Sequence, residues 1–248
     1  MSTLVIPRCL NYAGFSHSEA LSMIGKFTGM AMMIIGMPLI VVSSINTLLI
    51  PDLSQTMSKG NYYSASTRIR KVMKVAFILG LATSVVCFLI PDELGEIFYQ
   101  RSDLGNYIKY AGLCAPIFFV ATTMFGILNG INKQGIILRN SIIVAISELI
   151  GLFIFTSISW INIYGYIITL FITSIVSVVI NLYEVTKNIE LDISATNIII
   201  YILLALLTYF VFDILICKFV HPLTLVWSLV IILLTFGIFI FWGKFGES

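Results

Sequence analysis

One carboxylic acid lies in the middle of a hydrophobic stretch of this 248-residue chain. Glu148 follows Arg139 by nine residues, so in a helix its carboxyl lies roughly 13 Å deeper at about 1.5 Å per residue. Ser141, Ser147 and Gly151 fall on the same side of such a helix. A charged side chain inside a membrane costs about 2.5 to 3.5 kcal/mol or more, so it should face protein or water. Glu148 is therefore a candidate for a substrate pathway, or alternatively for a hydrogen-bonded contact between helices.

Two other hydrophobic stretches carry small or polar residues at spacings of three and four, namely Ser43, Asn46 and Thr47 in one and Thr122, Gly126 and Asn129 in the other. Residues at these spacings share one face of a helix. Together with Glu148, we interpret Ser43, Asn46, Thr122 and Asn129 as candidates for a polar pathway across the membrane.

Three prolines are candidate hinges. Proline removes a backbone hydrogen bond and kinks a helix, which lipid tolerates only where neighbours or water satisfy the freed carbonyl. Pro38 and Pro116 lie within hydrophobic stretches, whereas Pro51 is expected to end one at a cytoplasmic loop. The glycine pairs Gly25-xxx-Gly29 and Gly126-xxx-Gly130 in these stretches favour either helix movement or close helix packing.

Residues that commonly bind metals or carry out catalysis are sparse. His17 and His221 have no second ligand at helical spacing and no HExxH motif. Asp92, Glu93 and Glu96 lack the paired acidic motifs that would hold Mg²⁺ on a prenyl diphosphate. The four cysteines lie far apart and are interpreted as small hydrophobic residues. We therefore expect no catalytic residue, no metal site and no cofactor, and a protein that is not an enzyme.

The composition indicates whether these groups lie in water or in a membrane. Hydrophobic residues make up 59% of the chain and charged residues 10%, against about 25% charge in a soluble domain. The mean hydropathy is +1.04. These values predict an integral membrane protein, and the dispersed net charge of +2 excludes nucleic acid as an expected partner.

A membrane-spanning helix needs about 20 mainly apolar residues. Uncharged stretches of that length predict an all-α polytopic bundle of about seven helices, at 26–50, 72–91, 106–128, 136–157, 163–184, 197–217 and 222–243. We expect three parts: an extracytoplasmic segment at 1–25, a five-helix bundle at 26–190, and two additional C-terminal helices at 191–248.

Lysine and arginine are retained on the cytoplasmic side of membrane proteins. If residues 51–74 are cytoplasmic, that side holds nine cations, namely Lys59, Arg68, Arg70, Lys71, Lys74, Lys133, Arg139, Lys187 and Lys244. The other side holds five, namely Arg8, Lys26, Arg101, Lys109 and Lys218. This bias predicts a cytoplasmic C-terminus. Arg68, Arg70, Lys71 and Lys74 are then expected to fix the topology and to attract phosphate-bearing headgroups from a cytoplasmic loop.

Residues 6–61 resemble the stage V sporulation protein B group of polysaccharide exporters. The matching elements are Pro7-Arg8-x-Leu10-x-x-Ala13-Gly14, Ser18-Glu19-Ala20-Leu21, Gly25-x-x-Thr28-Gly29-Met30-Ala31 and Leu49-Ile50-Pro51-Asp52-Leu53-Ser54. The segments "YAGLCAPIFF" at 110–119 and "ILNGINKQG" at 127–135 resemble later helices of the same group. The resemblance covers residues 6 to about 190.

The resemblance implies the fold of the multidrug, oligosaccharidyl-lipid and polysaccharide exporter superfamily, whose members have two six-helix lobes around a central cavity. The seven expected helices correspond to the C-terminal half of a fourteen-helix exporter. Such proteins move lipid-linked sugars across the bacterial plasma membrane by alternating access, here for spore cortex, cell wall or peptidoglycan synthesis. The opposite wall would come from a missing N-terminal lobe, a separate chain or a second copy, and the gene product is expected to be a fragment.

Two other functions remain open on the sequence. A multidrug or cation antiporter of the same superfamily would use Glu148 as a proton or sodium site. A non-transporting scaffold of cell-wall synthesis would need none of the polar positions. The residues leave the substrate, the coupling ion and the oligomeric state undetermined.

Overall fold

The computed structural model describes residues 2–192, 194–219 and 225–245, and it contains helices and no strand within these ranges. His221 and the first residues of the expected helix at 222–243 lie outside the described residues, as do the side chains of Lys218 and Lys244.

The helices, in chain order, are α1 (Ser2–Tyr12), α2 (His17–Ile24), the π-helix η1 (Gly25–Ala31), α3 (Met32–Ser58), α4 (Tyr62–Leu89), α5 (Pro91–Tyr99), α6 (Gly105–Gly112), α7 (Ala115–Gly130), α8 (Gln134–Thr156), α9 (Tyr164–Thr186), α10 (Ala195–Phe219) and α11 (Leu225–Phe245). Among the described residues, six helices are long and apolar enough to cross a membrane, and the bent pair α6 and α7 makes a seventh. The expected polytopic bundle of about seven spans is confirmed.

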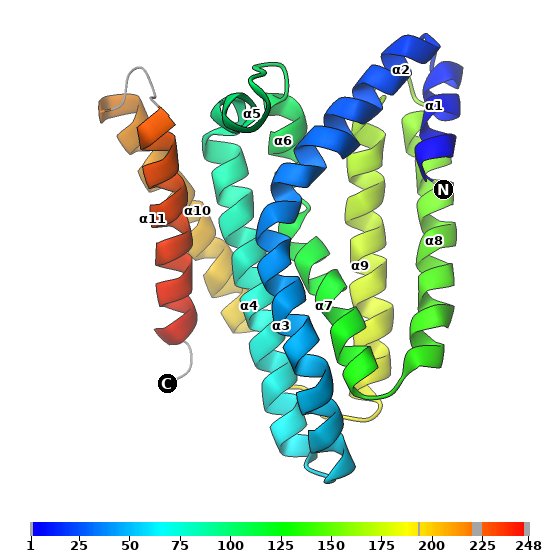
Figure 1. Cartoon of the computed structure of the whole chain (residues 1–248), viewed down its shortest axis with the longest axis vertical. Helices are drawn as coiled ribbons and strands as arrows, with labels where there is room; N and C mark the ends of the chain where they lie inside the picture. The colour runs from blue at the N-terminus through cyan, green and yellow to red at the C-terminus, as the bar shows by residue number, and fades with distance from the viewer. Residues whose placement is uncertain (1, 193, 220–224, 246–248) are drawn as a thin grey trace.

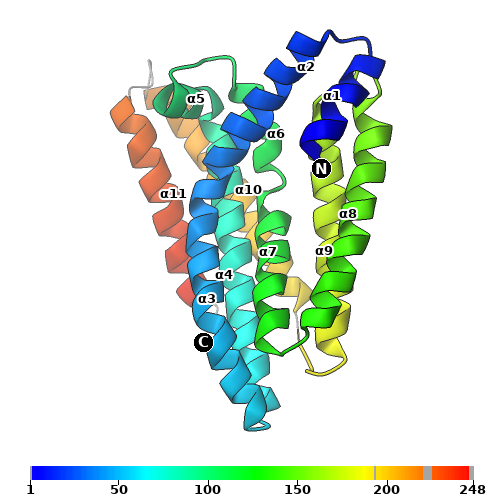
Figure 2. The same ribbon diagram turned by 45° about the vertical axis from the view of Figure 1, so that its right-hand side comes forward.

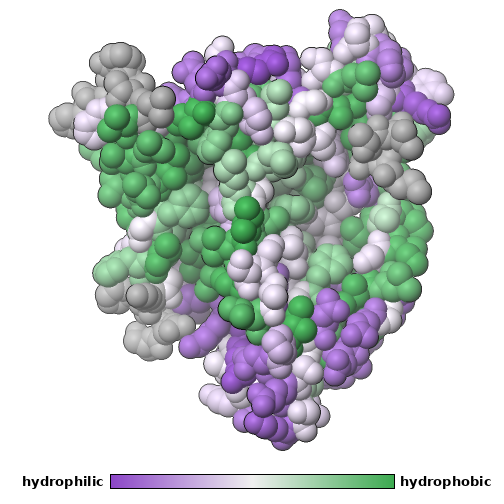
Figure 3. All heavy atoms as spheres, viewed as in Figure 1, coloured by the Kyte–Doolittle hydropathy of each residue, from purple (hydrophilic) through white to green (hydrophobic). Residues whose placement is uncertain are grey.

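The bundle is organised around α4 and α9 (Figure 1). α4 packs against α3, α7, α10 and α11, while α9 packs against α7 and α8. α1 covers part of α8, and α8 and α9 lie side by side in both views (Figures 1 and 2). On the surface, hydrophilic residues gather at the two ends and hydrophobic residues cover the middle (Figure 3). This is the pattern of a protein whose middle faces lipid and whose ends face water.

The expected bounds of the first helix, 26–50, were wrong. α2, η1 and α3 form one continuous helix from His17 to Ser58, so the helix runs through Pro51 instead of ending there. The connection to α4 is only Lys59–Asn61. Gly60 supplies a positive φ of 69° there, and the Asn61 side chain accepts a hydrogen bond from the Ser64 backbone N–H. The polar residues after Pro51 therefore belong to a helical hairpin that extends beyond the apolar span.

This change moves the basic residues from a loop onto a helix. Arg68, Arg70, Lys71 and Lys74 all lie in the first half of α4, which begins ten residues before the predicted start at 72. Figure 1 places the α3–α4, α7–α8 and α9–α10 connections at one end of the bundle. Lys59, Lys133 and Lys187 therefore share an end, as the orientation requires, while the identity of that end as cytoplasmic stays a prediction.

The described part of the expected segment at 1–25 is largely helical, with α1 and α2 joined by a turn. α2 begins with a capping box in which the Ser16 side chain accepts from the Glu19 backbone N–H and Glu19 accepts from the Ser16 N–H. Helix α1 buries Ile6, Cys9 and Leu10 in the bundle. Helix α1 is thus packed on the bundle, whichever side of the membrane it faces.

The third expected helix is broken. α6 and α7 meet at an angle of 56° across Leu113 and Cys114, and Pro116 lies in the first turn of α7. Pro116 therefore lies next to a bend, and its role as a hinge stays a prediction. α3 runs through Pro38 without a break, and a hinge at Pro38 stays a prediction.

Several glycines allow helices to approach closely. A Cβ at Gly126 would lie 2.9 Å from Asn46 Cγ, and one at Gly130 would lie 2.9 Å from Leu53 Cδ2, both between α7 and α3. The packing interpretation of Gly126 and Gly130 is confirmed. The packing interpretation of Gly25 and Gly29 in η1 was wrong, because a Cβ at either position would meet nothing within 4 Å.

Candidate functional site between α8 and α9

Helix α9 carries a buried stripe of polar side chains along one face, and these are Thr169, Thr173, Ser174, Ser177, Asn181 and Glu184. Successive members are mostly three or four residues apart, which keeps them on one side of the helix. None is more than 6% exposed. Polar groups inside a membrane protein are costly unless they are hydrogen-bonded, so this stripe should have partners on neighbouring helices.

The charged end of the stripe is an ion-pair group. Arg139 of α8 donates from Nη2 to Glu184 Oε1 at 2.6 Å, and Lys187 Nζ lies 3.3 Å from the same oxygen. The Glu184 side chain is 8% exposed, whereas Arg139 is 57% and Lys187 48% exposed. One buried carboxylate thus holds two cations that remain accessible, and the group carries one positive charge in excess.

Hydrogen bonds extend from this ion pair into the helix interface. Arg139 donates to Asn140 Oδ1 from Nε at 3.1 Å and from Nη2 at 3.0 Å. Asn140 Nδ2 donates to Asn181 Oδ1 at 2.8 Å, and Asn181 Nδ2 donates to Ser177 Oγ at 3.2 Å. We call Arg139, Asn140, Ser177, Asn181, Glu184 and Lys187 the α8–α9 polar cluster.

Close approach of the two helices makes these contacts possible. A Cβ at Gly151 would lie 2.8 Å from Thr169 Cγ2, and one at Gly165 would lie 2.5 Å from the Phe155 backbone. Thr169 and Thr173 satisfy their hydroxyls by donating to carbonyls of their own helix, at 2.8 Å each. The inner part of the interface is therefore tight and internally satisfied, and the exposed cations lie only at its charged end.

Glu148 lies in the middle region of α8, as predicted, and is half-buried. Its carboxyl makes no hydrogen bond or ion pair with any residue in the described ranges. It is not part of the α8–α9 polar cluster, and its role as a substrate-pathway residue stays a prediction.

Asn46 differs from the two residues with which it was grouped. It is 8% exposed and packs against Gly126 of α7, whereas Ser43 and Thr47 are exposed. Its Oδ1 is buried and has no hydrogen-bond partner within the described part of the chain. The Thr47 hydroxyl donates to the Ser43 carbonyl at 3.0 Å. The three therefore do not form one accessible polar face.

Thr122 and Asn129 are half-buried on α7 and use their polar groups locally. The Thr122 hydroxyl donates to the Phe118 carbonyl at 2.9 Å, and Asn129 Nδ2 donates to the Phe125 carbonyl at 2.9 Å. No hydrogen bond among the described residues connects either of them to Glu148 or Asn46.

The cations on α4 contact other helices and connections. Arg68 pairs with the Asp52 carboxylate and donates to Thr56 Oγ1 at 2.8 Å, which joins α4 to α3. Arg70 donates to the Asp192 carbonyl at 3.4 Å, and Lys74 donates to the Gly243 carbonyl at 2.7 Å. These residues therefore connect parts of the bundle, and their headgroup role stays a prediction.

A smaller ion-pair group lies at the opposite end of the bundle. Asp103 accepts from Arg101 at 2.7 Å and pairs with Lys26 of η1 at 2.7 Å. The hydrogen bonds from Arg101 and Lys26 hold the pKa of Asp103 well below its usual range. The pair therefore stabilises the folded chain at neutral pH, and this contribution is lost as the pH falls toward the lowered pKa.

Sequence reasoning missed the α8–α9 polar cluster. The signal was available on α9, where Ser177, Asn181 and Glu184 have the same spacing of four and three that identified the other stripes. Arg139 had been counted only as a cation for orientation. No group of three or more potential metal ligands occurs within the described ranges.

Comparison with known proteins gives two findings. Residues 14–154, more than half of the chain, match the MatE family model. The chain is 25% identical over 143 residues to Stage V sporulation protein B of Bacillus subtilis (strain 168). That similarity covers 58% of this chain and 28% of the relative, so the chain spans less than a third of that protein's length. No solved structure matches the chain.

Proposed function

This chain belongs to the MatE family, and from that membership we propose that it forms part of a transporter that moves lipid-linked saccharide or peptidoglycan precursors across the membrane. It is a multi-pass protein of the cell membrane. The relative is named for sporulation, and the similarity supports our proposal of a role in spore cortex or envelope synthesis.

The observation that carries this proposal is the α8–α9 polar cluster. Lipid-linked sugar precursors carry phosphate groups, and arginine is well suited to bind phosphate oxygens through its planar set of donors. Arg139 and Lys187 keep about half of their side-chain surface accessible while Glu184 holds them in place. In our proposal the phosphate contacts these two cations at the end of the bundle that also holds Lys59 and Lys133.

The buried part of the cluster positions these cations. Asn140 fixes the Arg139 guanidinium through two hydrogen bonds and is itself held by Asn181 of α9. Side chains held in this way lose less freedom on binding, which favours affinity. We propose that this bundle supplies one wall of a central cavity, and that an N-terminal lobe, a separate chain or a second copy supplies the other.

The experiment is a cellular one. In the source bacterium, depletion of the protein should raise the amount of lipid-linked saccharide precursor in membrane extracts, as measured by mass spectrometry. An Arg139→Gln variant should fail to restore the normal level. A Lys59→Gln variant, which changes an exposed cation at the same end, is the matched control and should restore it. An unchanged precursor level after depletion would contradict this function and would favour a non-transporting scaffold.

A second candidate function rests on Glu148. A half-buried carboxyl in the middle of a span with no hydrogen bond or ion pair to a described residue is available to bind a proton or cation. This favours a multidrug or cation antiporter as the alternative. In that case Glu148→Gln would abolish proton-dependent efflux of cationic dyes from cells, while Arg139→Gln would leave it intact.

A further inference from the structure

Asn46 of α3 occupies an unfavourable environment. Its side chain is buried, and its Oδ1 is the only buried side-chain nitrogen or oxygen in the described part of the chain that lacks a hydrogen-bond partner. A Cβ at Gly126 of α7 would lie 3.0 Å from this oxygen, so the amide lies directly against the neighbouring helix. A buried oxygen without a donor has lost the hydrogen bonds that water would give it. The observed contact between α3 and α7 is therefore costly for Asn46.

Polar side chains on the two helices do not supply the missing donor. On α7, Thr122 and Asn129 lie about one turn to either side of Gly126, and each donates to a carbonyl of its own helix. Thr47 of α3 likewise donates within its helix. These three donors are already used, so Asn46 gains a partner only if the contact between the helices changes.

α3 continues directly from a segment with a different helical geometry. η1 (Gly25–Ala31) is a π-helix of seven residues, in which hydrogen bonds join residues five apart instead of four. A π turn therefore holds one residue more than an α turn. Such segments are rare and occur frequently at functional sites. A Cβ at Gly25 or Gly29 would meet nothing within 4 Å, so one side of η1 has room for a change of geometry.

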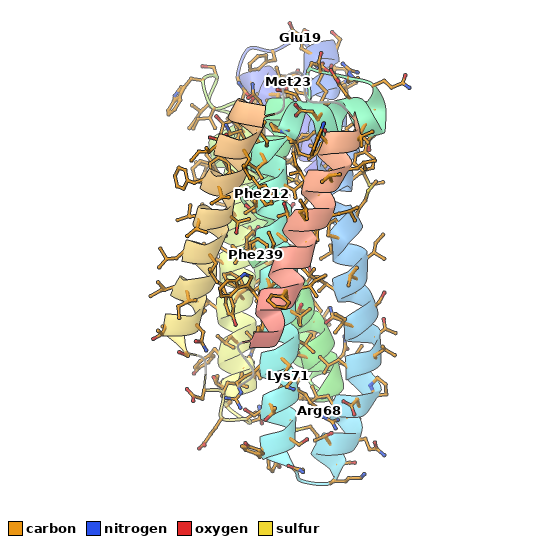
Figure 4. The ribbon with its side chains drawn as sticks, turned by 90° about the vertical axis from the view of Figure 1, so that its left-hand side faces the viewer. Glu19, Met23, Arg68, Lys71, Phe212 and Phe239 are labelled. Carbon is orange, nitrogen blue, oxygen red and sulfur yellow. The ribbon has the colours of Figure 1, made fainter. Side chains whose placement is uncertain are left out.

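Both ends of the continuous helix that contains α3 are held by other parts of the bundle. α2 packs against α1 at one end, and Asp52 pairs with Arg68 of α4 at the other. Figure 4 shows these two ends, with Glu19 and Met23 of α2 far from Arg68. A change of geometry in η1 must therefore be compensated within α3, before Asp52.

Pro51 is the place where α3 can take up the extra residue. It is the first proline beyond Asn46, and it has no backbone N–H, so the turn before it already lacks one hydrogen bond. If the π turn moves from η1 to this turn, every residue between them shifts by one position. At about 3.6 residues per turn, the shift rotates this part of α3 by about 100°. The residues from Asp52 onward keep their places.

The shifted arrangement buries apolar residues and releases Asn46. Each residue takes the place of the next one, so Ile45 replaces Asn46 against Gly126 and has as many non-hydrogen side-chain atoms. The residues that become buried are all apolar, namely Val41, Ile45 and Leu48. Asn46 takes the place of Thr47, which is exposed. The amide therefore leaves the contact with α7 and no apolar burial is lost.

We propose that the middle of α3 has two positions, which exchange when the π turn moves between η1 and Pro51. In the position observed here Asn46 is buried against α7. In the other position Ile45 takes its place, and Asn46 lies on the accessible side of α3 that also carries Ser43 and Ser44. The movement exposes or withdraws an amide while both ends of the helix stay in place. It does not depend on the proposed transport function or on the α8–α9 polar cluster.

Distances between spin labels test the rotation. The full chain without its native cysteines is reconstituted in bilayers, labelled at Ser43→Cys and Gln134→Cys, and measured by double electron–electron resonance. Ser43, Gln134 and the place of Ser44, to which Ser43 would move, are all exposed. A rotation of about 100° moves a side chain by up to about 8 Å, since an α-helix with side chains is roughly 10–12 Å wide. We expect two distances for this pair. Gln55→Cys with Gln134→Cys is the matched control, because Gln55 lies beyond Pro51, and should give one distance.

Four variants identify the cause of the second distance. Asn46→Leu removes the unsatisfied amide and should leave only the distance of the observed position. Asn46→Asp makes burial more costly and should raise the ratio of the second distance to the first by about tenfold. Pro51→Ala restores a backbone N–H and should suppress the second distance. Asn129→Leu is the control, because it removes an amide that already donates within its own helix, and should leave the ratio unchanged.

The outcomes separate this rotation from other movements. A single distance for the Ser43 and Gln134 pair, both in the unaltered chain and with Asn46→Asp, would overturn the proposal. Two distances for the Gln55 and Gln134 pair would also overturn it, since the whole helix would then move as one body. So would a ratio that Asn46→Leu leaves unchanged. A second distance seen only with Asn46→Asp supports the proposal, with the observed position dominant in the unaltered chain.

Discussion

Two pairs of neighbouring helices in this bundle are held in different ways. α8 and α9 pack directly on each other, with glycines at the contact and a hydrogen-bonded polar cluster at one end. α10 and α11 instead pack separately on α4, through a small apolar group that includes Ile78, Ala205 and Phe239. The first pair is joined by polar contacts between its two members, whereas in the second pair each helix packs on α4 through apolar surface and through Lys74, which donates to the Gly243 carbonyl.

The difference matters because lipid tails are as apolar as leucine. Helices in a membrane gain little from burying apolar side chains against each other, so close packing and hydrogen bonds determine which surfaces meet. The α8–α9 pair has both and should keep one arrangement. Among the described residues the α10–α11 pair shows neither between its members, so its arrangement depends on how each helix packs on α4.

The largest difference in stability between the two helix pairs is expected when a glycine in each is replaced by alanine. Gly165→Ala should destabilise the chain by about 3 kcal/mol, because its Cβ would lie 2.5 Å from the Phe155 backbone and the helices must separate. Gly237→Ala on α11 meets nothing within 4 Å and should change stability by less than about 0.5 kcal/mol. Unfolding measured in the same bilayer compares them. Equal losses would show that the two pairs are held in the same way.

Loss of the buried carboxylate should have the next largest effect. Glu184→Gln removes the negative charge that pairs with Arg139 and Lys187 and should cost about 2 kcal/mol, which is less than for a fully buried pair because both cations are partly exposed. A double-mutant cycle with Arg139→Gln measures the coupling between the two side chains. A coupling free energy near zero would show that this ion pair stabilises the chain no more than an exposed surface pair does.

A smaller effect is expected where the cluster is uncharged. Asn181→Leu leaves Asn140 Nδ2 without its acceptor and should cost about 1 kcal/mol, since hydrogen bonds between membrane helices are individually modest. The double variant Asn140→Leu with Asn181→Leu should recover part of this loss, because it leaves fewer polar groups unpaired. Thr173→Val is the control with little change expected, since its hydroxyl donates only within α9. A loss of similar size in Thr173→Val would show that the hydrogen bond between Asn140 and Asn181 contributes no more to stability than a hydrogen bond within α9.

Substitutions at the exposed connections should leave stability unchanged and report orientation. Lys59→Cys and Lys133→Cys lie at the same end of the bundle, and we expect membrane-impermeant thiol reagents to label both only from the cytoplasmic side. Both variants are made in a chain without its native cysteines. Labelling of either from outside the cell would reverse the proposed topology.

Hydropathy alone was sufficient for the number of spans, because each must supply about 20 apolar residues. It failed at the α3–α4 boundary, since these helices continue beyond the apolar region to Gly60 and Asn61. The residues that cap the hairpin were visible in the sequence. The prediction instead relied on Pro51 as the end of the helix, but a helix near a membrane surface can include a proline.

The site was harder to predict for a different physical reason. The partners Arg139 and Glu184 are 45 residues apart in sequence, and their contact depends on how α8 and α9 are aligned. Glu148 was found because depth can be counted along one helix. Asn46 was grouped with exposed neighbours because the sequence does not show that Gly126 of α7 packs against it.

The central claim is that the accessible cations of the α8–α9 polar cluster bind the phosphate of a lipid-linked saccharide. Native mass spectrometry of the purified chain with a polyprenyl-diphosphate disaccharide tests it most directly. We expect the wild-type chain and the Lys59→Gln control to bind the lipid, and Arg139→Gln to bind at least about tenfold more weakly, the factor that corresponds to roughly 1.4 kcal/mol. Equal binding by Arg139→Gln and the wild-type chain would contradict the account.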